Sequence, residues 1–187
     1  MNGPVYSPTR YRLPGQTGAS LIEVLVAILL LSFGLLSLGS MLAYAVQLPK
    51  LAGYRAMAAT LASGHIERMR SDTIGFTDGN YDENLSYNST LNVPSLNDCA
   101  YPDCTTTSLA IMDKAYTNRA LRKELPAGGM RVERDTASGP TDGNLWIIWN
   151  EPATFAALNP TNSDNCPPQV VDFVDPKPRC LYVRFKL

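Results

Sequence analysis

The chain has 187 residues, a length that suits one compact domain with an appended segment. Its 16 basic and 17 acidic residues nearly cancel, which argues against the strongly basic surface of a nucleic-acid-binding protein. The sequence has no Walker loop, dinucleotide fingerprint or His-Glu-x-x-His motif, and its one histidine is His65. We therefore expect no enzymatic activity, no cofactor, no metal site and no nucleic-acid partner.

The beginning of the chain combines a basic segment with a long apolar one. Residues 1–18 contain Arg10 and Arg12 but no acid, and Val24–Pro49 is a run of 26 residues without a formal charge. As a helix, such a run can cross a bilayer of about 30 Å. The two arginines place the amino terminus in the cytoplasm and the remainder across the membrane. The run is too long for a conventional secretory signal, so we expect any cut to precede it.

A single carboxylate adjoins this apolar run. Glu23 follows Gly18-Ala19-Ser20-Leu21-Ile22. At mid-bilayer depth a carboxylate costs at least about 2.5–3.5 kcal/mol, so there it needs a partner. Nearer the interface the cost falls, and Glu23 is then a tolerated flanking charge. Its position alone leaves both interpretations open.

The residues around Glu23 resemble the sequence motif of a known protein family. Gly18-Ala19-Ser20-Leu21-Ile22-Glu23, with the basic leader before it and the apolar run after it, resembles the type IV prepilin motif. The resemblance implies that a prepilin peptidase cuts after Gly18 and methylates Ala19, the new amino terminus; the family most often has phenylalanine at this position. Glu23 would become the fifth mature residue and pair with an α-amino group, in the same subunit or a neighbouring one. Such pairing would set the register of subunits in a filament, because an unpaired buried charge is costly.

We predict one helix from about Ser20 to Asp72, divided in function at residue 48. Residues 19–48 form the transmembrane or filament-core helix, in which Gly34 and Gly39 allow close approach of neighbouring helices. Pro49 removes a backbone donor and is expected to bend the helix. Residues 49–72 form an amphipathic helix half packed on the head, with His65 as a half-exposed face residue. Its apolar positions recur at steps of three and four: Leu51, Tyr54, Ala58, Leu61, Ala62, Ile66 and Met69.

Residues 73–187 predict a loop-rich globular head of the α+β class. A polar loop spans 73–105, and a short helix then ends at Leu125-Pro126-Ala127-Gly128-Gly129. Its apolar positions have helical spacing: Leu109, Met112, Tyr116, Ala120 and Leu121. Alternating patterns predict antiparallel strands at 130–135, 144–150 and 180–187, with a further apolar run at 170–174. This order predicts a long helix packed on a small antiparallel sheet.

The four cysteines, Cys99, Cys104, Cys166 and Cys180, all lie in the head. Their even number favours two disulfides in an oxidising compartment over free thiols or a metal site. Three pairings are open, and we favour Cys99–Cys104 and Cys166–Cys180 because each closes a local loop. The second loop would contribute about 3 kcal/mol of stability by the chain-entropy estimate.

The whole layout resembles the minor pilins of the PilV type, the type IV pilus modification proteins. The residues that carry this likeness are SLIEVLVAILLLSFGLL, the Cys99/Cys104 pair, LPAGGM and the strand LWIIW. The resemblance implies a subunit that primes or modifies pilus assembly and supports twitching motility and adhesion. Its partners would be other minor and major pilins, the prepilin peptidase and the inner-membrane assembly platform. The protein would cross the inner membrane once, with a periplasmic head, and then enter the pilus at the cell surface.

Two alternatives stay open at this stage. A pseudopilin of a type II secretion system has the same kind of anchor, and a membrane-anchored binding module that never polymerises would keep residues 1–18.

Overall fold

The computed structural model describes residues 18, 20–87, 95, 99–100, 102–151, 164–170 and 178–187. The chain divides into two compact units, Met1–Ala45 and Val46–Leu187. Among the described residues, the helical elements are α1 (Leu21–Ser71), α2 (Thr73–Thr77), α3 (Thr106–Glu124) and the 3-10 turn η2 (Pro168–Val170). The strands β1 (Gly129–Arg134), β2 (Asp142–Trp149) and β3 (Arg179–Lys186) form an antiparallel sheet in the order β1-β2-β3. This arrangement confirms the predicted α+β class.

Helix α1 begins and ends within one residue of the predicted bounds. It continues through Pro49, where the ring leaves one backbone carbonyl without its helical donor; the bend expected there stays a prediction. Arg68 and Arg70 lie in the last turn, where cations are favourable next to the helix carbonyls. The helix stops because Asp72 caps the next one, accepting the Gly75 N–H through Oδ1 at 3.0 Å. This cap creates α2 in a segment that the sequence predicted as loop.

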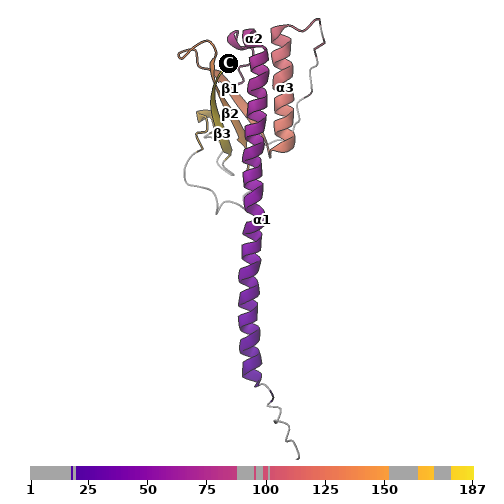
Figure 1. Cartoon of the computed structure of the whole chain (residues 1–187), viewed down its shortest axis with the longest axis vertical. Coiled ribbons are helices and arrows are strands. Elements are labelled where there is room, and N and C mark those ends of the chain that lie inside the picture. Colours follow the sequence, from indigo (N-terminus) through magenta and orange to yellow (C-terminus); the bar gives the residue numbers. More distant parts are fainter. Residues whose placement is uncertain are drawn as a thin grey trace, which may run out of the picture. The chain divides into compact units, whose positions relative to one another are not determined.

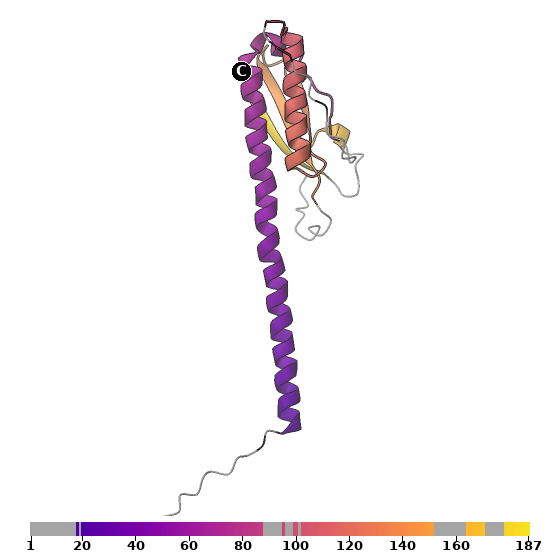
Figure 2. The ribbon, with the colours of Figure 1, turned by 90° about the vertical axis from the view of Figure 1, so that its right-hand side faces the viewer.

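The main core lies between the helices and one face of the sheet. In the second unit, α1 and α3 lie side by side over this face (Figures 1 and 2). The α1 residues that enter the core belong to the predicted apolar face: Ala58, Ala62, Ile66 and Met69. From the sheet they meet Met130, Val132, Leu145, Ile147, Trp149 and Phe185. Ala58 and Ala62, on adjacent turns of α1, allow the helix to pack closely against the rest of the core. The position of α1 therefore depends on shape complementarity as well as on buried apolar area.

Helix α3 is fixed at both ends. Its start is a capping box, in which the Thr105 N–H donates to Ser108 Oγ at 2.8 Å and the Ser108 N–H donates to Thr105 Oγ1 at 3.2 Å. Its end follows Glu124, as predicted, because Leu125 is extended and Pro126 cannot continue the helix. Of the five predicted apolar positions, Leu121 is buried, three are half-buried, and Tyr116 is 41% exposed. The buried positions of α3 are Ala110, Asp113, Thr117, Asn118 and Leu121.

The double glycine between α3 and β1 is required by close backbone approach. A Cβ on Gly128 would collide with the Leu121 carbonyl, and a Cβ on Gly129 would collide with the backbone of Tyr87. The following residues enter β1, whose outer edge is covered by a two-way backbone pairing of Val132 with Glu83 at 3.0 Å. The turn therefore brings the loop after α2, the end of α3 and the first strand together.

The sheet register separates two faces. Met130, Ile147 and Leu181 lie in one row on the helix side, and Arg131, Trp146 and Tyr182 lie in the next row on the outer side. A second small core lies on the outer side, formed by Tyr87, Ala127, Ile148, Val170 and Cys180. Val170 reaches it from η2; the rest of the apolar run predicted at 170–174 lies outside the described residues.

Candidate membrane and assembly segment

The first turn of α1 contains the carboxylate that the sequence singled out. The Ser20 carbonyl accepts the N–H groups of Glu23 at 2.9 Å and Val24 at 3.2 Å, so Ser20 occupies the cap position and Glu23 the third helical position. A serine followed three residues later by glutamate is the sequence of a capping box, and a carboxylate here is stabilised by the helix dipole by about 0.3–1 kcal/mol. Glu23 therefore favours helix initiation, a role that the sequence analysis did not consider.

Glu23 and Gly18 are both exposed, and no salt bridge within the described part of the chain involves Glu23. A Cβ on Gly18 would meet no atom within 4 Å. Residues 1–17 and Ala19 lie outside the described residues. The cut after Gly18, the methylated amino terminus at Ala19 and the pairing of Glu23 thus stay predictions.

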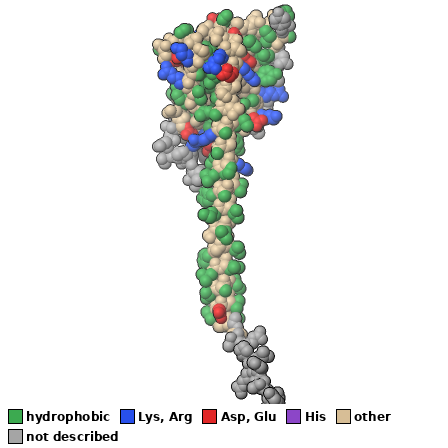
Figure 3. Space-filling view, viewed as in Figure 1, with side chains coloured by type: hydrophobic (Ala, Val, Ile, Leu, Met, Phe, Trp, Pro, Cys, Tyr) green, Lys and Arg blue, Asp and Glu red, His purple; other side chains and the backbone are tan. Residues whose placement is uncertain are grey.

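The first half of α1 exposes apolar side chains all round rather than along one stripe. Figure 3 shows these side chains on the face turned to the viewer. The exposed large side chains between Leu21 and Leu48 are Leu21, Ile22, Val24, Leu25, Val26, Ile28, Leu29, Leu30, Leu31, Phe33, Leu35, Leu36, Leu38, Met41, Leu42, Tyr44, Val46 and Leu48. In the described part of the chain, α1 is the one helix long and apolar enough to span a bilayer. A helix that is apolar on every side is stable only in lipid or among other apolar helices.

Three serines within this segment satisfy their own hydrogen-bond donors. The hydroxyl groups of Ser32, Ser37 and Ser40 donate to backbone carbonyls one turn earlier at 2.7, 2.9 and 2.8 Å. A hydroxyl that donates to its own helix enters an apolar environment at little cost, because it leaves no unpaired donor. The serines are therefore compatible with lipid or with a filament core.

The glycines of this segment have no packing role within the described chain. A Cβ on Gly34 or Gly39 would meet nothing within 4 Å. Each glycine lowers helix stability by about 1 kcal/mol relative to alanine. Since no intramolecular contact requires them, any compensation must come from a neighbouring molecule.

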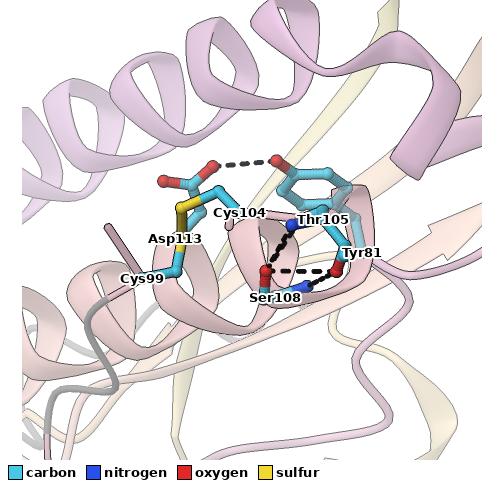
Figure 4. The surroundings of a disulfide bond; sticks show 6 residues. All are labelled: Tyr81, Cys99, Cys104, Thr105, Ser108 and Asp113. Atoms are coloured by element: carbon cyan, nitrogen blue, oxygen red, sulfur yellow. Dashed lines mark hydrogen bonds between the residues drawn. A yellow bond between two sulfur atoms is a disulfide. The ribbon is translucent and has the colours of Figure 1, made fainter. Parts of the chain in front are cut away.

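A buried polar cluster joins α1 to α3 in the second unit. His65 Nδ1 lies 2.8 Å from Thr117 Oγ1, the Thr117 hydroxyl donates to the Asp113 carbonyl at 2.9 Å, and the Tyr81 hydroxyl donates to Asp113 Oδ2 at 2.8 Å. Figure 4 shows the Tyr81–Asp113 pair near the start of α3. The prediction that His65 is half-exposed was wrong, since it is 1% exposed.

Burial dominates the ionisation of this cluster. Desolvation, followed by the positive charges of Arg68 and Lys114, lowers the pKa of His65 to about 3. Desolvation and the hydrogen bond to Asp113 raise the pKa of the Tyr81 hydroxyl. His65 is therefore neutral at physiological pH and serves the packing of α1 on α3.

Both disulfides have the favoured local pairing. Cys99–Cys104 and Cys166–Cys180 each have Cα atoms 5.3 Å apart, within the range that a disulfide spans. The first bond directly precedes the capping box of α3, as Figure 4 shows. The second ties the segment before η2 to β3.

A buried ion pair, which the sequence analysis missed, lies near the second disulfide. Arg179 Nε lies 2.9 Å from Asp164 Oδ2 and 3.6 Å from Glu151 Oε2, and Arg55 of α1 lies 3.6 Å from Asp164. These groups are far apart in the sequence and no local pattern connects them. They link α1, the segment at 164–170 and β3.

The described residues contain no group of three or more His, Cys, Asp or Glu side chains placed to hold a metal ion. Comparison with known proteins found no matching family model, no matching curated protein and no matching solved structure. The long apolar amino-terminal helix and the small antiparallel sheet are compatible with a pilin-like fold.

Proposed function

We propose that this chain is a minor type IV pilin, a structural subunit that is processed at Gly18 and then primes or modifies pilus assembly. The observation that carries the proposal is the first half of α1. It exposes apolar side chains on every side, and its first turn holds Glu23, which follows Gly18-Ala19-Ser20-Leu21-Ile22. One helix thus combines a membrane anchor with a charged group at its end.

Before assembly the bilayer covers the apolar side chains of α1. In a filament, the same surface packs against the helices of other subunits, and Glu23 enters an environment poor in water. The amine created by cleavage, with a reference pKa near 7.7–8.0, is largely cationic and neutralises this carboxylate. Removing one partner of a buried ion pair costs about 3–5 kcal/mol, so the pairing selects one register.

Within this class we propose the PilV type rather than a pseudopilin of a type II secretion system. Two disulfides in the head and the sequence likeness at LPAGGM and LWIIW support this choice; LPAGGM is the turn into β1, and LWIIW lies in β2. Recovery of the chain with sheared surface pili, and not with secretion complexes, is the expected result. Recovery with secretion complexes alone would favour the pseudopilin.

The test of the pairing uses two glutamates of the same helix. Glu23→Gln removes the charge in the first turn, and Glu67→Gln removes an exposed charge that is paired with Arg70. We expect both variants to insert into the membrane. Incorporation of Glu23→Gln into pili should be at least about tenfold lower than that of the wild type, whereas incorporation of Glu67→Gln should be unchanged. Equal incorporation of the two variants, measured by immunoblotting of sheared pili, would exclude a pairing role for Glu23.

A further inference from the structure

The outer face of the sheet carries an aromatic row that the pilin role does not use. Arg131, Trp146 and Tyr182 are direct cross-strand neighbours on β1, β2 and β3. The rings of Trp146 and Tyr182 have centroids 5.2 Å apart and planes inclined by 32°, and the Arg131 guanidinium lies 6.0 Å from the centre of the Trp146 ring. Tyr182 is 37% exposed. We call these three residues the aromatic platform.

The aromatic platform borders a small pocket and a polar row. The pocket has a volume of about 220 Å3 and is lined by Trp146, Asn165, Cys166, Pro167, Pro168 and Tyr182. The Cys166–Cys180 disulfide fixes its far wall to β3. Two residues along each strand, Glu133, Asn144 and Arg184 form the next cross-strand row on the same face. An apolar floor thus adjoins carboxylate, amide and guanidinium groups, the combination found in small-molecule sites.

We propose that this platform binds a neutral sugar, with one pyranose ring stacked on the exposed face of Tyr182, whose other face meets Trp146, and with its hydroxyl groups directed at Asn144. The weakly positive C–H groups on one face of a pyranose pack against the electron-rich faces of aromatic rings. The pocket has room for a single ring.

The charges of the platform favour a neutral sugar over an acidic one. Arg131 is paired with Glu133 at 3.0 Å, and Arg184 is paired with Asp135 at 3.1 Å. Both guanidinium groups therefore already have a carboxylate partner, and little positive charge remains to hold an anion. Asn144 accepts the Tyr182 hydroxyl proton at 2.8 Å through Oδ1, and its amide N–H groups are the donors suited to sugar hydroxyl oxygens.

A proline-rich peptide is the competing occupant of an aromatic surface. Such peptides dock in aromatic-lined grooves as extended polyproline II helices. In this structure, Trp146 Nε1–H already donates to the Asn165 carbonyl at 3.0 Å, and this chain's own Pro167 and Pro168 line the pocket. The Trp146 N–H and the space beside its ring are thus already occupied by this chain's own residues, which argues against a proline-rich peptide.

The inference goes beyond the assembly role and does not depend on it. The test uses the full chain in micelles of a detergent without a sugar headgroup. The probes are methyl β-galactopyranoside, methyl β-glucopyranoside and methyl α-mannopyranoside. Binding is followed by indole fluorescence, to which Trp146 is the responsive contributor because the other tryptophan, Trp149, is 1% exposed. Saturable binding of at least one probe is expected.

Three variants test the site. Tyr182→Ala should weaken binding at least about tenfold, Tyr182→Phe should keep the stacking, and Tyr116→Ala, which removes a comparably exposed tyrosine of α3, should have no effect. Saturation-transfer NMR on the wild-type chain, with irradiation of aromatic protons, should reach the C–H face of the bound sugar. This measurement keeps the test valid if Tyr182→Ala unfolds.

Absence of saturable binding by all three sugars would overturn the proposal. Equal loss of binding in Tyr182→Ala and Tyr116→Ala, without saturation transfer to the sugar, would also overturn it. Binding of a proline-rich peptide but of no sugar would assign the surface to the competing occupant.

Discussion

His65 donates a hydrogen bond to Thr117 across the interface between α1 and α3. The two atoms, Nδ1 and Oγ1, are 2.8 Å apart, and the single proton of the Thr117 hydroxyl is already donated to the Asp113 carbonyl. The imidazole proton therefore lies on Nδ1. Nε2 is left as a buried acceptor without a partner in the described part of the chain. A second proton on this ring would place a cation in the core beside Arg68 and Lys114.

This geometry predicts acid sensitivity of the head. The pKa of His65 is about 3 in the folded state against 6.5 in the unfolded state, so below pH 6.5 the unfolded state binds more protons. Stability is then lost as the pH falls from 6.5 towards 3, by up to about 1.4 kcal/mol per pH unit, and is insensitive to this group above pH 6.5. Urea unfolding of the full chain in micelles between pH 6.5 and 5 should show the loss.

The control for the acid effect is His65→Gln, whose amide still donates a hydrogen bond but does not titrate. Its stability should depend less on pH than that of the wild type in the same range. Parallel pH profiles for the two proteins would mean that other groups cause the acid effect.

The two disulfides should differ in their contribution to stability. In the chain-entropy estimate, closing the longer loop of Cys166–Cys180 contributes about 3 kcal/mol, and the short ring of Cys99–Cys104 contributes about 2 kcal/mol. We expect the double variant Cys166→Ser/Cys180→Ser to melt at a lower temperature than Cys99→Ser/Cys104→Ser. If neither pair of substitutions changed the melting temperature, the disulfides would have no stabilising role in the head.

The buried ion pair predicts a strong effect from one carboxylate and a weak effect from its exposed neighbour. Asp164→Asn removes the nearer carboxylate of Arg179, whose side chain is 7% exposed, and leaves Glu151 at 3.6 Å. We expect it to cost about 3 kcal/mol. Arg55→Ala removes a 53% exposed partner of the same aspartate and should cost at most about 1 kcal/mol. Urea unfolding measures both values. Similar losses of stability in the two variants would mean that the Asp164–Arg179 pair does not contribute more to stability than the exposed pair.

Sequence periodicity predicted the helix faces that are buried through regularly spaced apolar residues. It missed the side chains that are buried through a hydrogen bond to a residue distant in the sequence. The apolar face of Ala58, Ala62, Ile66 and Met69 was confirmed, because burial of a helix face repeats with the helical period. On α3 the spacing predicted the helix and its buried Leu121 but missed the buried Thr117, which hydrogen-bonds a residue 52 positions earlier in the chain. Local patterns contain no record of such a partner.

The candidate assembly segment was more accessible to sequence reasoning than the head. A long uncharged run and a carboxylate are adjacent in the sequence, so their arrangement on one helix follows from local structure alone. In contrast, the short helix α2 arises from a single cap by Asp72, and the platform of Trp146 and Tyr182 arises from strand pairing. Neither has a strong local signal.

The glycines of α1 predict a dependence of assembly on side-chain size. Because a Cβ on Gly34 meets nothing within 4 Å, Gly34→Ala and Gly34→Leu should both insert into the membrane normally. Alanine should raise the stability of the isolated helix by up to about 1 kcal/mol. If neighbouring helices approach at this position, incorporation into pili should fall from alanine to leucine. Wild-type incorporation of Gly34→Leu would remove the proposed role of this glycine.

The central claim is that cleavage after Gly18 creates a cation that meets Glu23, and the mass of the native amino terminus tests it most directly. Mass spectrometry of the protein recovered from cells should show a chain that begins at methylated Ala19, while Gly18→Ala should accumulate as an uncut precursor. A native chain that retains Met1, Arg10 and Arg12 would contradict the account.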